Sequence, residues 1–135
     1  MATADLTLAD ARRVLDGALA HAESIGQPMN VAVVDAAGHL ITFARQDGAI
    51  LASIDIATRK ARTAALFRMS TAALGEEALP EGSLYGVEVT NGGLVVFGGG
   101  IPIADPQGRP AGAVGVSAGS VDQDTAVAQA GVDAY

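Results

Sequence analysis

Apolar residues repeat at helical spacing in three parts of the chain. From Leu8 onward they recur every three or four positions, and Thr7 stands before them as a candidate N-cap. A second such segment follows Ser53, whose hydroxyl we expect to cap it, and a third follows Ser120 or Asp122. The predicted helices cover residues 8–25, 54–68 and a last segment that ends near 134, with a short helical turn at 70–74.

Short runs that favour β-structure lie between the predicted helices. They are joined mainly by tight-turn signals, such as Asn91-Gly92-Gly93 and the segment 105–110. Such connections favour an antiparallel sheet with helices on its faces, that is, an α+β fold. The length of the chain indicates one domain over residues 1–135. The predicted strands cover residues 29–35, 40–45, 86–90, 94–98, 101–105 and 111–118.

Composition narrows the classes of function. The chain has no cysteine, which excludes disulfides, zinc–thiolate sites and iron–sulfur clusters, and its net charge of −7 argues against nucleic acid as a partner. Neither a signal peptide nor a membrane-spanning run of about 20 apolar residues is evident, so we expect a soluble, cytoplasmic protein. With 50% apolar and only 17% charged residues, we also expect the chain to associate with itself.

Half of the eight basic residues lie within ten positions, at Arg59, Lys60, Arg62 and Arg68. Arg59 has Asp55 four residues before it on the predicted helix and is typical of a paired, solvated face. Lys60 has no acidic residue within one turn and lies on an apolar stripe. Either it extends along apolar surface to solvent, or it meets an anion or carboxylate in a cleft.

Two glycine- and serine-containing segments are further candidates for ligand contact. The three glycines Gly98, Gly99 and Gly100 let another group approach the backbone closely, although a bend between strands explains them equally. Ser117 lies where a strand leads into the last helix, a place suited to an anion, while ordinary capping by Ser120 is the simpler interpretation.

The remaining candidates are scattered. His21 and His39 do not form a local metal-ligand spacing, although a lone histidine can ligate haem iron. Asp35 and Asp47 are candidate general bases, but Asp35 equally suits a turn, and Asp47 suits a surface pair with Arg45.

Four motifs, in this order and at these separations, resemble the family that contains GlcG, HbpS and the C-terminal domain of PduO. They are VAVVDAAGHLITFARQDGA, KARTAALF, GGGIPI and GAVGVSAGSVDQDTAVAQAG, and the resemblance covers about residues 5–134. It implies a profilin-like fold, with a five-stranded antiparallel sheet flanked by helices, and assemblies from dimers to octamers. Some members bind haem and some are described as haem-degrading.

The resemblance also implies particular site residues. The family's lysine-and-threonine motif corresponds to Lys60 and Thr63, and its Gly-Gly-x-Pro turn begins at Gly99 and Gly100. Its arginine–aspartate–glycine segment corresponds to Arg45, Asp47 and Gly48, and His21 lies on the helix where a related domain uses histidine.

Three hypotheses about function therefore stand together. The chain binds haem or a related tetrapyrrole, with His21 as the axial ligand and Lys60, Arg62 or Arg45 neutralising the propionates. Alternatively, it binds or converts a small organic acid held by Lys60, Thr63, Ser117 and the glycine backbone. The third hypothesis is an oligomeric accessory protein without catalysis. None of them calls for a metal site other than haem iron, and whether the chain is an enzyme is left open.

Overall fold

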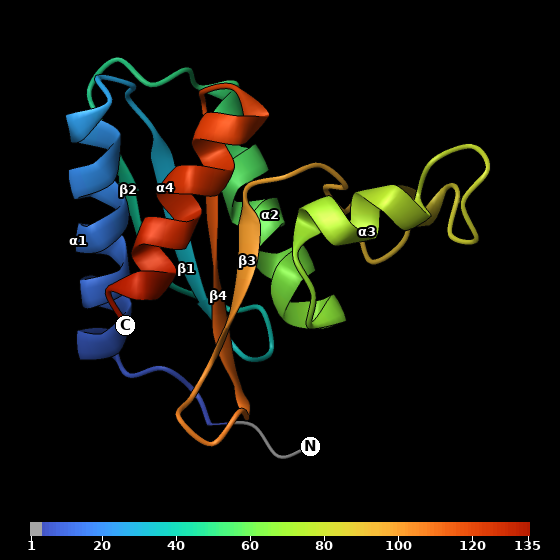
Figure 1. The fold of residues 1–135 in the computed structure, drawn as a ribbon, viewed down its shortest axis with the longest axis horizontal. Helices are drawn as coiled ribbons and strands as arrows, with labels where there is room; N and C mark the ends of the chain where they lie inside the picture. Colours follow the sequence, from blue (N-terminus) through green and yellow to red (C-terminus); the bar gives the residue numbers. More distant parts are fainter. Residues whose placement is uncertain (1–3) are drawn as a thin grey trace.

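A four-stranded antiparallel sheet lies at the centre of the computed structural model, which describes residues 4–135 (Figure 1). The strands follow the order β2-β1-β4-β3, so β1 and β4 are the inner pair. Tight connections join β1 to β2 and β3 to β4, as the turn signals predicted, and the α+β class is confirmed. The bounds are β1 Asn30–Asp35, β2 Leu40–Arg45, β3 Gly100–Ala104 and β4 Pro110–Ser117.

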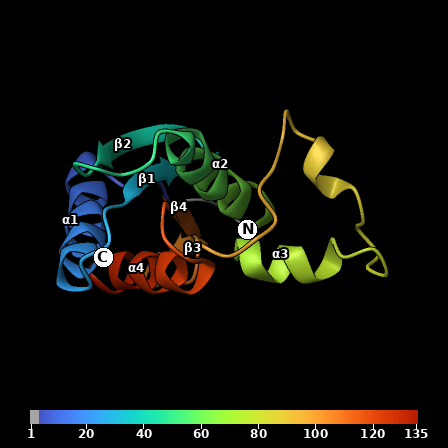
Figure 2. The same ribbon diagram turned by 90° about the horizontal axis from the view of Figure 1, so that it is seen from above.

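Helices cover both faces of the sheet (Figure 2). The pair α1 and α4 packs on one face, whereas α2 lies alone on the other, and α3 extends away from the sheet. Within the described chain, no helix has both the length and the apolar character required to cross a membrane. The helix bounds are α1 Leu8–Ser24, α2 Ala52–Phe67, α3 Thr71–Glu77 and α4 Val121–Asp133.

The two faces of the sheet have different cores because strand side chains alternate. Branched residues such as Val33 and Val114 pack beneath α1 and α4. Small residues face α2, and a Cβ added to Gly115 would lie only 2.1 Å from the carbonyl oxygen of Ala57. The absence of that Cβ therefore lets α2 lie almost directly on the sheet, where Ala57 and Ala61 are fully buried.

The prediction of five strands was wrong, because the structure has four. Residues 86–90 contain a 3₁₀ turn at Val87–Val89 instead of a strand. Residues 94–98 run without a strand partner in the described chain, although their apolar alternation favoured a strand. The N–H of Val95 donates to the side-chain oxygen of Thr63, which replaces the expected ladder hydrogen bond.

The predicted helix caps had mixed outcomes. Thr7 and Ser120 each cap a helix and form reciprocal capping boxes with the residues three positions on, Asp10 and Gln123. The prediction for Ser53 was wrong: the N-cap position is occupied by Leu51, without a side-chain cap, and Ser53 is buried inside α2. Its hydroxyl accepts a hydrogen bond from Ser117 instead.

The segment from Thr71 to Phe97, here called the arm, projects from the body of the molecule (Figures 1 and 2). It contains α3 and the 3₁₀ turn, and both of its ends are fastened to the body by backbone N–H groups. Gly100 donates to the hydroxyl of Thr71, and Val95 donates to that of Thr63. The arm therefore has a fixed base and an extended, exposed tip.

Candidate functional site

Lys60 is fully buried and forms an ion pair with a residue 64 positions away. Its Nζ donates to Oδ2 of Asp124 at 2.9 Å and to the carbonyl oxygen of Val116 at 2.8 Å. Burial lowers the pKa of Lys60 below its ordinary value of 10.5, and the hydrogen bond and charge of Asp124 partly offset that effect. Of the two alternatives left by the sequence, the lysine thus meets a carboxylate, and the carboxylate belongs to the chain itself.

Gly99 and Phe97 cover the Lys60 ammonium. Gly99 has φ +125°, and a Cβ at this position would lie 2.6 Å from Nζ, so the glycine backbone is required for the close approach. The ring of Phe97 is 5.0 Å from Nζ, within the range of a cation–π contact, and is 46% exposed. Lys60 is fully buried beneath these groups, and a ligand-binding role for it stays a prediction.

Thr63, Gly100 and Ser117 also lie in the interior, each bonded to another part of the chain. Thr63 donates to the carbonyl oxygen of Arg59 and accepts from Val95, and Gly100 donates to Thr71. Ser117, which is 4% exposed, donates to Ser53. The structure therefore brings the predicted residues of α2, β4 and the glycine turn together, but as a network of internal hydrogen bonds.

Two further cations of this cluster, Arg59 and Arg62, bind a loop. Nη1 of Arg59 donates to the carbonyl oxygens of Gly92 and Gly93, and Nη1 of Arg62 donates to that of Asn91. These three consecutive residues all have positive φ angles of 52°, 73° and 105°, so their turn is left-handed as its sequence predicted. The pairing of Arg59 with Asp55 is also confirmed. Arg59 and Arg62 thus hold residues 91–93, the part of the arm that leads back to the body, against α2.

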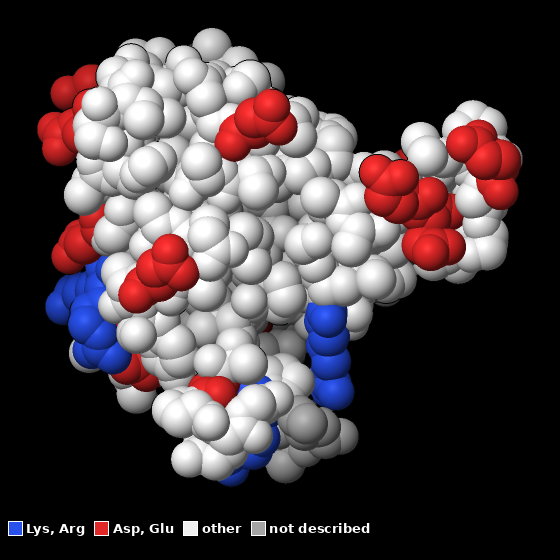
Figure 3. Space-filling model, viewed as in Figure 1, with Lys and Arg blue, Asp and Glu red and all other residues white. Residues whose placement is uncertain are grey.

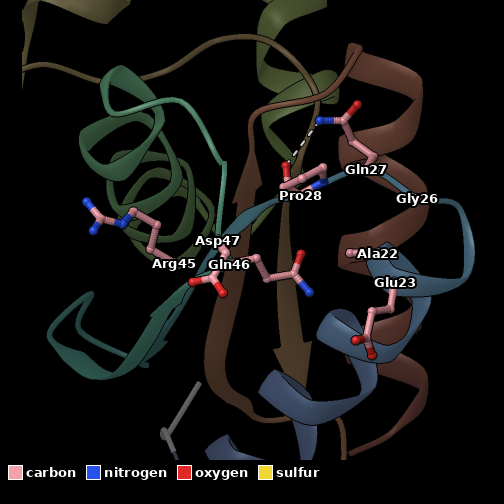
Figure 4. Close-up of a pocket in the computed structure, with 8 residues that line it drawn as sticks. All are labelled: Ala22, Glu23, Gly26, Gln27, Pro28, Arg45, Gln46 and Asp47. Atoms are coloured by element: carbon pink, nitrogen blue, oxygen red, sulfur yellow. Dashed lines mark hydrogen bonds between the residues drawn. The ribbon is translucent and has the colours of Figure 1, made fainter.

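Arg45 and Asp47 line an open hollow of about 480 Å³ between the end of α1 and the end of β2 (Figure 4). The side chain of Arg45 extends away from α1, and no ion pair between the two residues is present among the described contacts. The other charged group of the lining is Glu23. Two carboxylates against one guanidinium give the hollow a negative balance, which disfavours an acidic ligand.

The two histidines differ in their surroundings. Nδ1 of His39 lies 3.5 Å from Oδ2 of Asp35, and Oδ1 of Asp35 accepts the N–H groups of Ala37 and His39. Asp35 is therefore a turn residue, one of its two predicted interpretations. The imidazole of His21 is partly buried and makes no hydrogen bond or ion pair among the described contacts, so its ring nitrogens are available.

His21 does not share the hollow with Arg45. Successive residues of a helix are about 100° apart, so His21 lies about 160° around α1 from Glu23, which lines the hollow. It lies instead one turn beyond Gly17, which packs against Ala130 of α4 and against Ala134, the residue after that helix. Among the described residues, no cluster of three or more histidine or acidic side chains is arranged to hold a metal ion.

Comparison with known proteins identifies the class to which this arrangement belongs. Residues 6–133 match the family model described as "Haem degrading protein HbpS-like", and the chain therefore belongs to that family. The predicted relationship to HbpS and PduO is confirmed.

Individual relatives are similar along nearly the whole chain. An uncharacterized 15.0 kDa protein from the dhaT-dhaS intergenic region of Citrobacter freundii is 38% identical over 133 residues, which is 98% of this chain and 93% of that protein. The corrinoid adenosyltransferase PduO of Salmonella typhimurium is 34% identical over 96% of this chain, which spans only 38% of PduO. The crystal structure of a PduOC:heme complex has a TM-score of 0.92 and 33% identity, and the match covers 98% of this chain and 96% of that one.

Sequence reasoning missed Asp124 and Phe97, the partners of Lys60. An aspartate at the start of the last predicted helix suggests interaction with the helix dipole, and nothing local marks it as the partner of a lysine 64 residues earlier. Phe97 was placed in a strand that does not form.

Proposed function

We propose that the chain binds haem or a related tetrapyrrole, with the imidazole of His21 as the axial ligand. The observation that carries this proposal is the free, partly buried His21 side chain, together with 33% identity and a TM-score of 0.92 to a protein solved as a haem complex. Neutral imidazole is a common ligand of haem iron. His39 is less suitable because it is exposed and lies beside Asp35.

His21 lies one turn after Gly17 on α1, so its imidazole is close to the contact between α1 and α4. Gly17 packs closely at this contact, because an added Cβ would lie 2.5 Å from the Cβ of Ala134. A macrocycle ligated by His21 would therefore lie against exposed surface beside this contact and not over Gly17. A single copy of the chain would leave the other side of the macrocycle uncovered.

Arg13 is the cation best placed for a propionate. It lies eight residues before His21, about 12 Å along α1, on the same side as Gly17. Its guanidinium is half-exposed but paired with Asp10, so a propionate would have to compete with that carboxylate. The three cations predicted from the sequence are less favourable, because Lys60 is buried, Arg62 binds the arm, and Arg45 lies across α1.

A haemin titration tests the proposal. The wild-type chain is expected to give a saturating Soret band at stoichiometric haemin, and His21→Ala is expected to shift the band and weaken binding at least about ten-fold. His39→Ala is the matched control and should behave as wild type. The proposal fails if haemin gives no band, or if His21→Ala binds as wild type does.

We also propose that the chain forms homo-oligomers through the arm. Its tip exposes large apolar side chains that the body of the same chain does not cover, and such patches mark association surfaces. Acidic side chains gather on the arm, while the basic ones visible in Figure 3 lie on the body, over the first half of α1, beside the base of the arm and near the β3–β4 hairpin. Contact between two arms would bring like charges together, so we expect the arm to dock on the body of a second copy. The exposed apolar residues are Leu79, Leu84, Tyr85 and Val89.

Light scattering after gel filtration tests this second proposal. The double substitution Tyr85→Glu and Val89→Glu places charge on side chains that are 62% and 83% exposed, so it should dissociate the oligomer without unfolding the chain. Leu40→Glu, on the exposed side of β2, is the control and should not dissociate it. A wild-type chain that stays monomeric at high concentration would refute the proposal.

A further inference from the structure

One hollow of about 350 Å³ lies between the end of α2 and the β3–β4 hairpin. Its single charged lining residue is Arg68, and none of its lining residues is acidic. Asp5, which accepts a hydrogen bond from the N–H of Ala36, is not part of the lining. The walls are mainly apolar and include Ala36, Ala65, Pro102, Ile103, Ala104 and Pro110.

Charge distinguishes this hollow from two others in the structure. The hollow at Arg45 contains two carboxylates, and a third hollow combines Arg13 with Asp10 and Asp105. Each of those linings has one cation against two carboxylates. The hollow at Arg68 is therefore the one among the three whose lining has a positive charge balance, which favours an anion.

The backbone of Arg68 gives a second, independent reason to examine this residue. Arg68 ends α2 in the left-handed conformation, with φ 54° and ψ 38°. Glycine is the usual residue at such a helix end, because any side chain is strained there. Strained residues are often found at functional sites. Among the described contacts, the guanidinium has no hydrogen bond or ion pair that would explain the presence of arginine.

We propose that this hollow binds an amphipathic monocarboxylate, whose carboxylate pairs with Arg68 and whose hydrocarbon part lies against the apolar walls. A guanidinium presents two parallel N–H donors that match one carboxylate. Pockets of this size and lining bind ligands that are mostly apolar with one fixed polar group. A free inorganic anion such as phosphate fits less well, because the other lining side chains supply no further hydrogen-bond donors.

The site is separate from the one proposed for haem. His21 lies on α1, which covers one face of the sheet, whereas Arg68 ends α2 on the other face (Figure 2). Binding at Arg68 therefore depends neither on His21 nor on haem, and either proposal can fail without the other.

Calorimetric titration of the full chain with octanoate tests the inference, with amide NMR shifts locating the bound probe. Octanoate is expected to bind and to shift the amides of Ala65, Ile103 and Gly112. Arg68→Gly should weaken binding at least about ten-fold without lowering the melting temperature, since glycine adopts the left-handed conformation without strain. Octanamide, the uncharged analogue, should bind as weakly to the wild type as octanoate binds to Arg68→Gly.

Two further variants sharpen the result. Arg68→Lys keeps the charge but loses the paired donors, so its affinity should fall between those of wild type and Arg68→Gly. Arg45→Gln removes the cation of the negatively lined hollow and should leave octanoate affinity unchanged. The inference is overturned if octanoate does not bind, if Arg68→Gly binds as wild type does, or if phosphate binds more tightly than octanoate.

Discussion

Lys60 and Asp124 are the charged pair that water does not reach, since their side chains are 0% and 3% exposed. Each oxygen of Asp124 has a partner: Oδ2 accepts from Lys60 and Oδ1 accepts from the N–H of Gly119. The pair joins α2 to α4 across the end of β4, where Val116 supplies a second acceptor. Removal of either member would leave the other charge buried without compensation.

Asp124→Asn is therefore expected to lower the free energy of unfolding by about 3 kcal/mol or more. Asp55→Asn is the matched control, because it removes the carboxylate of an exposed pair and should cost less than about 1 kcal/mol. The double variant Lys60→Met with Asp124→Leu, which leaves no buried charge, should recover most of the loss. Chemical denaturation measures all three variants, and equal effects of the two single substitutions would contradict this description.

The lowered pKa of Lys60 predicts a pH dependence of defined sign. In the interval between its lowered pKa and the ordinary value of 10.5, the unfolded chain keeps the lysine proton and the folded chain has lost it. Stability rises with pH wherever the unfolded state binds more protons. The free energy of unfolding of the wild type should therefore rise toward pH 10.5, relative to the Lys60→Met, Asp124→Leu variant. A fall of the wild type relative to that variant would show that the pKa is raised.

At the scale of elements, the arm depends on side chains of α2 that accept or donate hydrogen bonds at its base. Thr63 is 1% exposed, and its hydroxyl accepts the N–H of Val95 at 3.2 Å. Thr63→Val keeps the shape of the side chain and removes this acceptor. We expect hydrogen exchange to become at least about ten-fold faster at Val95, while the amides of β1 stay protected. Thr58→Val, on the same helix, is the control. Unchanged exchange at Val95 in Thr63→Val would argue against a role of this hydrogen bond in holding the base of the arm.

A feature of these elements could be predicted from the sequence when the residues that form it are close together along the chain. Thr7 and Ser120 bond to backbone three residues away, so their caps were visible in the sequence. Ser53 has the same chemistry, but its hydroxyl pairs with Ser117, which is 64 residues distant. Only the packing of α2 on β4 brings those two serines together, and no pattern along the chain contains that information.

The predicted site shows the same limit. Lys60 was identified correctly as unusual because its stripe is apolar, but its partner is on α4 and its cover is on the arm. The strand predicted at residues 94–98 followed from alternation alone, whereas strand formation also requires a neighbouring edge with free hydrogen-bonding groups. Those residues pass over the α2 side of the molecule, where a threonine hydroxyl is the available acceptor.

Across the whole molecule, different surfaces have different roles. The cations of α2 hold the interior and the arm, Arg68 faces its own apolar hollow, and α1 presents the free imidazole of His21. Membership of the HbpS-like family and the similarity to a haem complex support the proposal that His21 ligates haem iron. The chain has two histidines, which makes that assignment directly testable.

The decisive measurement is the NMR spectrum of histidine ring nitrogens in ¹⁵N-histidine-labelled protein, with and without gallium protoporphyrin IX, a diamagnetic analogue of haem. One ring nitrogen of His21 is expected to change its chemical shift strongly on binding, while both nitrogens of His39 keep theirs. A bound porphyrin that leaves the His21 nitrogens unchanged, or shifts those of His39 instead, would contradict this expectation.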